Sequence, residues 1–276
     1  MKPNIKYFYE DIAVNSIVVL LALFMGCDTQ QDNYDVSGKL KEILIDKSVV
    51  TFVSSDGQIS EVSGGLVMPY TILLTYRANG MLESYYYNYI NDYHWRMTFD
   101  GSNDQITKGS GVISGLFPQE EISRHYIRTG EVISRIIDSL YWNERMFING
   151  VDTTVEHLDI ESYNYFYDNA ENVIQVEKYT NDTLSTRIEY EYDDEINPLI
   201  DQPIEFMPDG DLHVNLELIV KKHNYISIKK TTFEVNGSVD IRSNHIEYKY
   251  SKNGYPVSAK CIGQSGREVI YNYHYY

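Results

Sequence analysis

Residues 246–256, Ile-Glu-Tyr-Lys-Tyr-Ser-Lys-Asn-Gly-Tyr-Pro, contain the pattern that decides the fold. Ile246, Tyr248 and Tyr250 alternate with charged residues, as in a strand with one buried face and one face in water. The pair Asn253-Gly254 follows, and Asn-Gly is favoured in two-residue turns because both residues adopt positive φ at low cost. The stretch therefore predicts a strand that ends in a hairpin turn.

The same unit recurs along the chain, with an aromatic residue four places before the turn glycine and an apolar residue soon after it. Further copies begin at Tyr76, Phe206 and Phe233, and Tyr126 and Tyr167 begin variants, the second of which lacks the glycine. The Asn-Gly and Asp-Gly pairs are Asp56-Gly57, Asn79-Gly80, Asp100-Gly101, Asn149-Gly150, Asp209-Gly210, Asn236-Gly237 and Asn253-Gly254. The repeated unit is a hairpin, so the chain predicts consecutive antiparallel strands.

The predicted fold is all-β, a single antiparallel meander of about ten or more strands that is strongly curved or closed into a barrel. Strands of a parallel sheet are buried on both faces and would show continuous aliphatic runs instead of alternation. Closure is favoured because a long meander otherwise leaves two unpaired edges. We predict strand-turn-strand for 118–140, with a short helix at 119–123 as the alternative, and one long excursion between hairpins for the proline-containing residues 194–211.

The first 26 residues predict a signal peptide. Lys2 and Lys6 precede the apolar run from Ile17 to Phe24, which is shorter than the roughly 20 residues that span a bilayer. The run ends in Gly26-Cys27, which resembles the lipobox of bacterial lipoproteins, in which the cysteine is lipidated and becomes the first residue of the mature chain. The expected organisation is a signal peptide at 1–26, a tether at 27–37 that begins with lipidated Cys27, and a β-meander domain at 38–276. The alternative is a buried N-terminal strand or helix with an incidental cysteine.

The hairpin unit, the lipobox and the tyrosine-rich C-terminus together resemble a wider group of proteins. The aromatic-x-x-Asn-Gly unit is similar to the tyrosine-rich YD/RHS-type hairpin repeat, and residues 38–276 resemble Gram-negative bacterial lipoproteins of unknown function with a porin-like, meandering β-fold. The resemblance implies a curved or closed sheet at the outer membrane, held by lipid and facing the periplasm or the cell surface. It supplies no catalytic residue.

The charge and the motifs exclude several function classes. The net charge of −17 disfavours binding to nucleic acid and adsorption to anionic lipid. The seven histidines show no zinc-ligand spacing, and the chain has no Gly-x-Ser-x-Gly elbow, phosphate-binding loop or dinucleotide fingerprint. We therefore expect no metal, no cofactor and no enzymatic activity. With Cys27 lipidated, Cys261 is the second of only two cysteines and is expected to be inert strand packing.

Tyrosine is the most informative residue type, with 26 of them in the chain. Consecutive tyrosines in a strand must point to opposite faces, so some rings of the densest cluster must lie outside or in a lumen. Exposed tyrosines bind sugars and proteins well, because they bring contact area at low entropic cost. The candidate binding residues are Tyr85, Tyr86, Tyr87, Tyr89, Tyr93 and Trp95. The alternative is cross-strand pairing that only stiffens the sheet.

The expected function is a lipid-anchored cell-envelope protein with a non-enzymatic binding or structural role. The expected partners are the membrane, through Cys27, and a neutral glycan or an envelope protein, through exposed tyrosines. Two alternatives are an integral outer-membrane β-barrel and a glycan-active hydrolase. Charges at Glu189, Glu191, Lys229 and Lys230 fall in the middle of predicted strands, and a membrane barrel tolerates such charges only on its lumen side.

Overall fold

The computed structural model describes residues 40–45, 48–55, 58–64, 70–88, 94–102, 105–114, 120–148, 151–200, 202, 204–206, 214–216 and 222–276. Within these ranges strands are the only regular secondary structure. The described residues contain no helix that is long and apolar enough to cross a membrane. The strands are β1 (Leu40–Ile45), β2 (Ser48–Ser55), β3 (Gln58–Gly64), β4 (Tyr70–Tyr76), β5 (Leu82–Asn88), β6 (His94–Ser102), β7 (Gln105–Ser114), β8 (Glu120–Thr129), β9 (Val132–Ile148), β10 (Val151–Tyr167), β11 (Val173–Thr180), β12 (Thr183–Ile196), β13 (Ile204–Phe206), β14 (Val214–Leu216), β15 (His223–Phe233), β16 (Val239–Tyr250), β17 (Pro256–Gly263) and β18 (Glu268–Tyr275).

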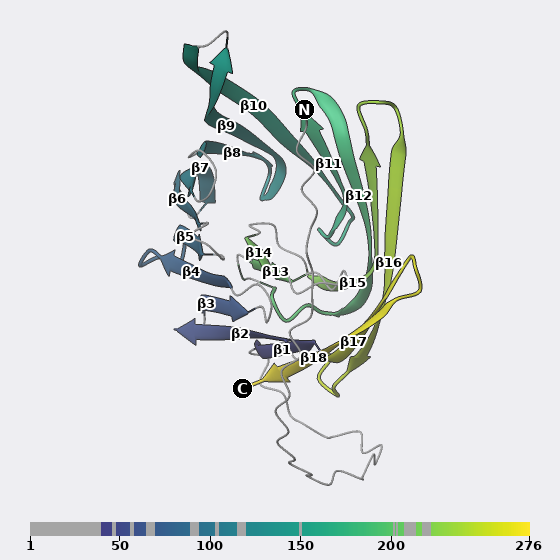
Figure 1. Cartoon of the computed structure of the whole chain (residues 1–276). Helices are drawn as coiled ribbons and strands as arrows, with labels where there is room; N and C mark the ends of the chain where they lie inside the picture. Colours follow the sequence, from purple (N-terminus) through teal and green to yellow (C-terminus); the bar gives the residue numbers. More distant parts are fainter. Residues whose placement is uncertain are drawn as a thin grey trace, which may run out of the picture. The chain divides into compact units, whose positions relative to one another are not determined.

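Sixteen of these strands form one closed antiparallel barrel (Figure 1). Each strand pairs with the next in the chain, except that β12 pairs with β15, and β13 pairs with β14 in a separate two-stranded sheet. The barrel closes where β18 pairs with β1, from Leu40 opposite Tyr275 to Ile45 opposite Tyr271. The predicted all-β meander that closes into a barrel is confirmed, and closure leaves the sixteen strands without a free edge.

The period-two alternation separates a largely apolar inner face from an outer face on which charged side chains alternate with exposed apolar ones. Ile246 is 1% exposed and lies on the inner face, whereas Glu247 and Lys249 are exposed on the outer face, as predicted. The inward side chains form one continuous hydrophobic core. Its largest fully buried members are Tyr225, Tyr271, Phe52, Phe99, Ile43, Ile72, Met97, Ile246, Val50, Val62 and Val173. Burial of aromatic and aliphatic side chains of this size stabilises the fold by about 1.5–3 kcal/mol each.

Three of the predicted Asn-Gly turns connect strands, but with a geometry different from the predicted one. At Gly80, Gly237 and Gly254 the glycine has φ of 83°, 83° and 79°, whereas the preceding asparagine does not have positive φ. The Gly80 N–H donates to the Arg77 carbonyl at 2.9 Å, and the Arg77 N–H donates to the Met81 carbonyl at 2.9 Å. This is typical of a longer loop whose last residue is a left-handed glycine at a bulge.

The asparagine before the glycine has its own role in these turns. The Asn236 side-chain oxygen accepts a hydrogen bond from the Ser238 N–H at 2.8 Å, a local contact that short polar side chains favour in turns. The variant that begins at Tyr167 has the same pair of backbone bonds, and Glu171 takes the glycine position with φ of 68°. The predicted kinship of this segment with the glycine-containing units is therefore confirmed.

Two further positions depart from the turn prediction. Gly101 lies inside β6 at a bulge, where a Cβ would come within 1.9 Å of the Gln105 carbonyl oxygen, so the glycine permits close backbone approach instead of forming a turn. The two-residue turn with both residues at positive φ occurs at Asn181 and Asp182, with φ of 48° and 63°. The predicted pairs at 56–57, 149–150 and 209–210 lie outside the described residues.

Two of the aromatic residues that precede the turns join neighbouring hairpins through a tyrosine hydroxyl. Tyr76, at the end of β4, donates to the Ile59 carbonyl at 2.7 Å, and Tyr167, at the end of β10, donates to the Ile133 carbonyl at 2.6 Å. In each case the acceptor lies just after an earlier turn at the same end of the barrel. Two further bonds follow this rule, Tyr192 to Val173 at 2.6 Å and Tyr275 to Pro256 at 2.8 Å. We call these four side chains the tyrosine clasps.

The connection between β12 and β15 enters the barrel. The predicted excursion at 194–211 is confirmed in part, because 194–196 still belong to β12 and 204–206 form β13. Leu199 is 7% exposed and belongs to the core, where it lies beside the inward-facing Ile43 and Tyr273. The Gln202 side-chain oxygen accepts a hydrogen bond from the Ile59 N–H on β3 at 2.9 Å. The cavity left beside Leu199 has a volume of about 10 Å³, room for no more than about one water molecule. The connection therefore fills part of the lumen.

The predicted strand-turn-strand at 118–140 is confirmed by β8 and β9, which meet at Gly130 and Glu131. The alternative of a short helix at 119–123 is wrong for Glu120 to Ser123, because these residues pair with β7 and β9. Cys261 is 1% exposed and packs in the core, as expected for an inert cysteine.

Candidate functional site

The predicted tyrosine cluster divides between the two faces of the barrel wall. Tyr85, Tyr87 and Trp95 face inward, and Tyr85 is 3% exposed, so its ring is not available on the outer surface. Tyr86 faces outward, opposite Arg96 on β6. Tyr89 and Tyr93 lie outside the described residues, as do Cys27 and the whole of 1–39. The predicted alternation of consecutive tyrosines is confirmed, and the predicted binding role stays a prediction.

The inward rings of the cluster form a connected aromatic layer. The Tyr85 and Tyr87 centroids lie 6.4 Å apart with nearly parallel planes, and Tyr70 stacks on Tyr87 at 5.9 Å. Trp95 meets Tyr85 edge to face at 5.9 Å. Burial raises the pKa of Tyr70 well above its usual value, and the neighbouring Tyr87 adds to the rise. These rings stiffen the sheet by cross-strand contact, which was the alternative interpretation of the cluster.

A buried ion pair lies against this aromatic layer. The Arg124 guanidinium lies 5.9 Å from the Trp95 ring centroid and donates two hydrogen bonds of 2.6 Å to the Asp138 carboxylate. Asp138 is 2% exposed. Burial acts to lower the pKa of Arg124, but the hydrogen bonds and charge of Asp138 outweigh it and raise the pKa above its usual value. The guanidinium is therefore charged at every accessible pH.

A second ion pair continues the polar wall onto β10 and β11. Lys178 Nζ lies 2.6 Å from Glu161 Oε1, and the Tyr163 hydroxyl donates to the same carboxylate at 2.6 Å. Lys178 also lies 5.5 Å from the Tyr163 ring centroid. Burial, followed by the hydrogen bond to Glu161, raises the pKa of Tyr163 well above its usual value. Because Asp138 lies directly opposite Glu161 across β9 and β10, the two ion pairs are neighbours on the inner face.

A third polar contact lies on the long hairpin β9–β10. The rings of Trp142 and His157 stack at 3.9 Å, and the Trp142 Nε1–H donates to Asp159 Oδ2 at 3.3 Å. His157 Nε2 lies 3.3 Å from Glu144 Oε2, an ion pair that forms when His157 is protonated. Register places Trp142 and His157 in the same inward row as Trp95.

The inner wall carries hydrogen-bonding groups. Two of its carboxylates, Asp138 and Glu161, are each engaged by a cation at 2.6 Å, and the described residues contain no group of three His, Cys, Asp or Glu side chains that could hold a metal ion. Sequence reasoning missed Arg124 and Asp138 because they are 14 residues apart and meet only through the β8–β9 register. A correct prediction of the register between β8 and β9 would have brought these two residues together.

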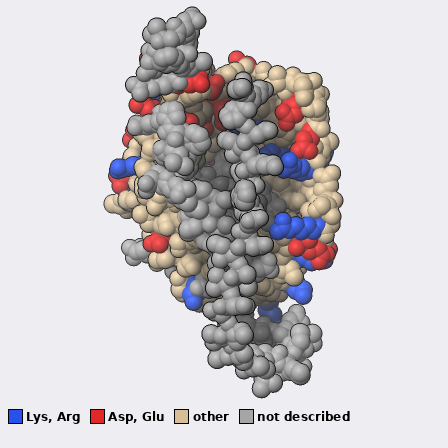
Figure 2. Space-filling view, viewed as in Figure 1, with Lys and Arg blue, Asp and Glu red and all other residues tan. Residues whose placement is uncertain are grey.

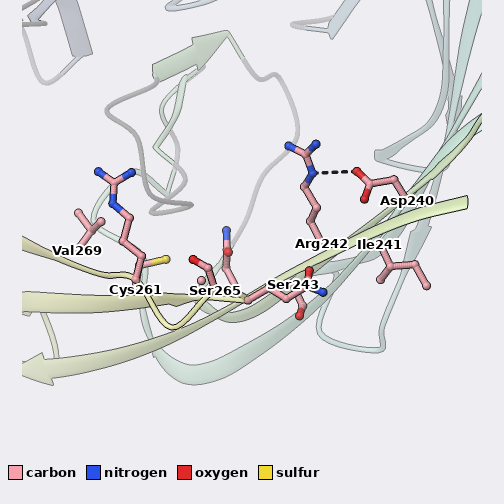
Figure 3. A pocket seen from close by; sticks show the side chains of 11 residues that line it. Asp240, Ile241, Arg242, Ser243, Cys261, Ser265 and Val269 are labelled. Atoms are coloured by element: carbon pink, nitrogen blue, oxygen red, sulfur yellow. Dashed lines mark hydrogen bonds and ion pairs between the residues drawn. The ribbon is translucent and has the colours of Figure 1, made fainter.

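A separate recess lies at the β17–β18 turn (Figure 3). Its volume is about 610 Å³, and Arg242 and Asp240 of β16 project into it, joined by an ion pair of 2.9 Å. Cys261 lies at its wall, and Ile241 points to the opposite side of the strand. In the sheet order, β12 and β15 lie between this recess on β16 to β18 and the two ion pairs on β8 to β11.

Comparison with solved structures supports the fold. A porin-like protein from Bacteroides vulgatus covers 86% of this chain and 99% of its own chain, with a TM-score of 0.52 and 12% sequence identity. A porin-like protein from Bacteroides uniformis covers 89% and 99%, with a TM-score of 0.36 and 11% identity. No protein-family model and no curated protein matches the chain. The first likeness shows that the chain shares a porin-like β-barrel fold.

Proposed function

We propose that this chain is a lipid-anchored protein of the outer membrane with a non-enzymatic binding role, carried out by a barrel that stands in water. The anchor is the lipid on Cys27, and the lipobox-like sequence supports it. The porin-like fold is consistent with an outer-membrane location.

The observation that carries this proposal is the charge on the outer wall. Glu189 and Lys229 form an outward ion pair of 2.8 Å in the middle of β12 and β15. Glu177 and Arg187 do the same at 2.8 Å on β11 and β12, where their outward position follows from the register. The face drawn in Figure 2 carries both acidic and basic side chains, separated by larger areas of other residues. An arginine or lysine facing lipid at mid-bilayer costs about 2–4 kcal/mol, so this wall suits water.

The partly occupied lumen supports binding in preference to conduction. Sixteen strands can enclose an aqueous channel. Here many inward side chains form a continuous core, and Leu199 of the β12–β15 connection packs into it. The outer wall is the surface that we propose for recognition, and Tyr86 is the member of the predicted cluster that lies on it.

The second candidate is an integral outer-membrane β-barrel, and the likeness to a porin-like structure favours it. The two proposals differ in what touches the outer wall, water or lipid. A glycan-active hydrolase remains the third alternative from the sequence, and turnover of a polysaccharide by the purified protein would support it.

The test compares the full-length protein with Cys27→Ser. We expect the wild type in the membrane fraction, with a lipidated Cys27 at its N-terminus by mass spectrometry, and the variant released in soluble form. An integral barrel would instead stay in the membrane after a carbonate wash of the variant. An unmodified Cys27 in membrane-bound wild type would contradict the anchor.

A further inference from the structure

We propose that a groove on the outer wall across β6 to β9 binds a neutral glycan, with Tyr141 as the stacking platform and Arg96 and Glu121 as the hydrogen-bonding groups. This inference rests on the proposed function, because it requires the outer wall to face water. It names the site and the class of ligand.

Strand register assembles the groove from residues that are distant in sequence. Residues paired across neighbouring antiparallel strands lie on the same face, so the outward position of Tyr86 extends to its partners on each following strand. The row runs through Tyr86, Arg96, Val112, Glu121, Tyr141 and Leu158. Within this row the groove runs from Arg96 to Tyr141, three inter-strand steps or about 14 Å, which is long enough for a short oligosaccharide.

The next row makes the floor. Thr98, Ser110 and Ser123 pair in sequence across β6, β7 and β8 and carry only short hydroxyl side chains. Long side chains of the first row stand beside these short ones, and the difference in height hollows the surface. The resulting cavity has a volume of about 420 Å³ and is lined by both rows. That volume is within the range of small-molecule sites.

The chemistry of the rim suits a sugar. Tyr141 is 48% exposed, so its ring presents an apolar face that can stack on the C–H face of a pyranose while its hydroxyl stays in water. Arg96 and Glu121 offer a planar donor and a planar acceptor, which form strong hydrogen bonds to vicinal hydroxyls. Because one cation and one anion flank the groove, its charges balance, and a neutral ligand fits better than an acidic one.

The floor of the groove favours a sugar over a protein partner. Serine is depleted in protein interfaces and their centres are mainly apolar, whereas the floor here consists of the hydroxyl side chains of Thr98, Ser110 and Ser123. The exposed Leu158 and Ile160 extend the Tyr141 edge of the groove, 49% and 43% exposed. They provide an apolar margin on which further sugar rings can lie.

The experiment is a binding screen of the purified, unlipidated barrel against immobilised short neutral oligosaccharides, built from glucose, mannose, galactose or xylose, and against uronate-containing oligosaccharides as the charged set. Titration calorimetry with the best neutral oligosaccharide follows. We expect Tyr141→Ala to weaken binding about tenfold and Glu121→Gln to weaken it about fivefold. The matched controls are Tyr276→Ala and Glu191→Gln, which remove an exposed tyrosine and an exposed carboxylate elsewhere, and both should bind as the wild type does.

Each result of the binding screen either supports or overturns the proposed glycan groove. Neutral binding that falls with the groove variants and not with the controls supports the proposal. Neutral binding that survives Tyr141→Ala and Glu121→Gln overturns the groove but leaves a binding role standing. Binding to the uronate set alone, or to neither set, overturns the glycan assignment, and the fate of the lipid anchor is judged separately from Cys27→Ser.

Discussion

Replacing Tyr192 with Phe removes one hydroxyl from the barrel interior and leaves the ring in place. In the native protein this hydroxyl donates to the Val173 carbonyl at 2.6 Å. Val173 is 0% exposed, so water cannot replace the lost donor. The variant therefore tests whether the tyrosine clasps hold neighbouring hairpins together.

The magnitude follows from the cost of a buried acceptor that loses its donor, about 1–3 kcal/mol. We expect Tyr192→Phe to lower the free energy of unfolding by about 1.5 kcal/mol. The acceptors of Tyr76 and Tyr167 are nearly as buried, since Ile59 is 4% and Ile133 is 3% exposed. If the four clasps act independently, the quadruple Tyr→Phe variant should lose about 4–6 kcal/mol, a large part of the total stability of a typical domain.

Urea denaturation followed by far-UV circular dichroism measures the change. An unchanged slope of the unfolding free energy against urea concentration shows that the variant exposes the same surface area on unfolding as the wild type. The matched control is Tyr141→Phe on the exposed outer wall, which should stay within about 0.5 kcal/mol of the wild type. The argument is refuted if Tyr192→Phe is as stable as the wild type, or if the exposed control loses as much as the clasp variant does.

Three further predictions concern the ion pair, the turns and the tyrosines. Arg124→Met should lower the free energy of unfolding by about 3–5 kcal/mol because it leaves Asp138 buried without its cation. The double variant Arg124→Met/Asp138→Leu should recover most of that loss in denaturation experiments. A double variant whose loss equals the sum of the two single-variant losses would contradict this. Gly237→Val should lower the free energy of unfolding by about 1–2 kcal/mol because of the φ of 83° alone, since no neighbour lies within 4 Å of an added Cβ. Gly237→Asn should have a melting temperature close to that of the wild type. Equal melting temperatures for the wild type and both variants would be evidence against this. Burial raises the pKa of Tyr273 above its usual 10.0, so the folded state keeps a proton that the unfolded state releases. Stability should therefore hold below pH about 10 and fall as the pH rises further, and the part of the tyrosinate absorbance that comes from buried rings should appear as the chain unfolds.

The strand pattern could be predicted because its causes are local. Side chains two residues apart share a face, so the alternation at Ile246, Tyr248 and Tyr250 gave both the strand and its buried side. The proline-containing excursion was also predictable, since proline removes a ladder donor wherever the chain places it. Closure into a barrel followed from the number of hairpins and the need to hide edges.

The turn geometry shows the limit of local rules. Asn-Gly predicted a two-residue turn, yet at Asn236 the side chain is bonded to Ser238 and only Gly237 has positive φ. The two-residue turn formed at Asn181 and Asp182 instead. Loop length is set by how the flanking strands pair, and this pairing depends on bulges that no dipeptide specifies.

The sequence alone determined that this chain is an antiparallel meander with hairpins along its whole length, because strand period and turn chemistry act within a few residues. Only the tertiary structure decided which tyrosines serve as clasps, that Arg124 meets Asp138 inside the barrel, and that Tyr141 stands in one outward row with Arg96. The physical reason is register: a shift of one residue between two strands would turn every side chain to the opposite face. Contacts across several strands therefore depend on every register between them, and all of these registers are fixed only in the closed barrel.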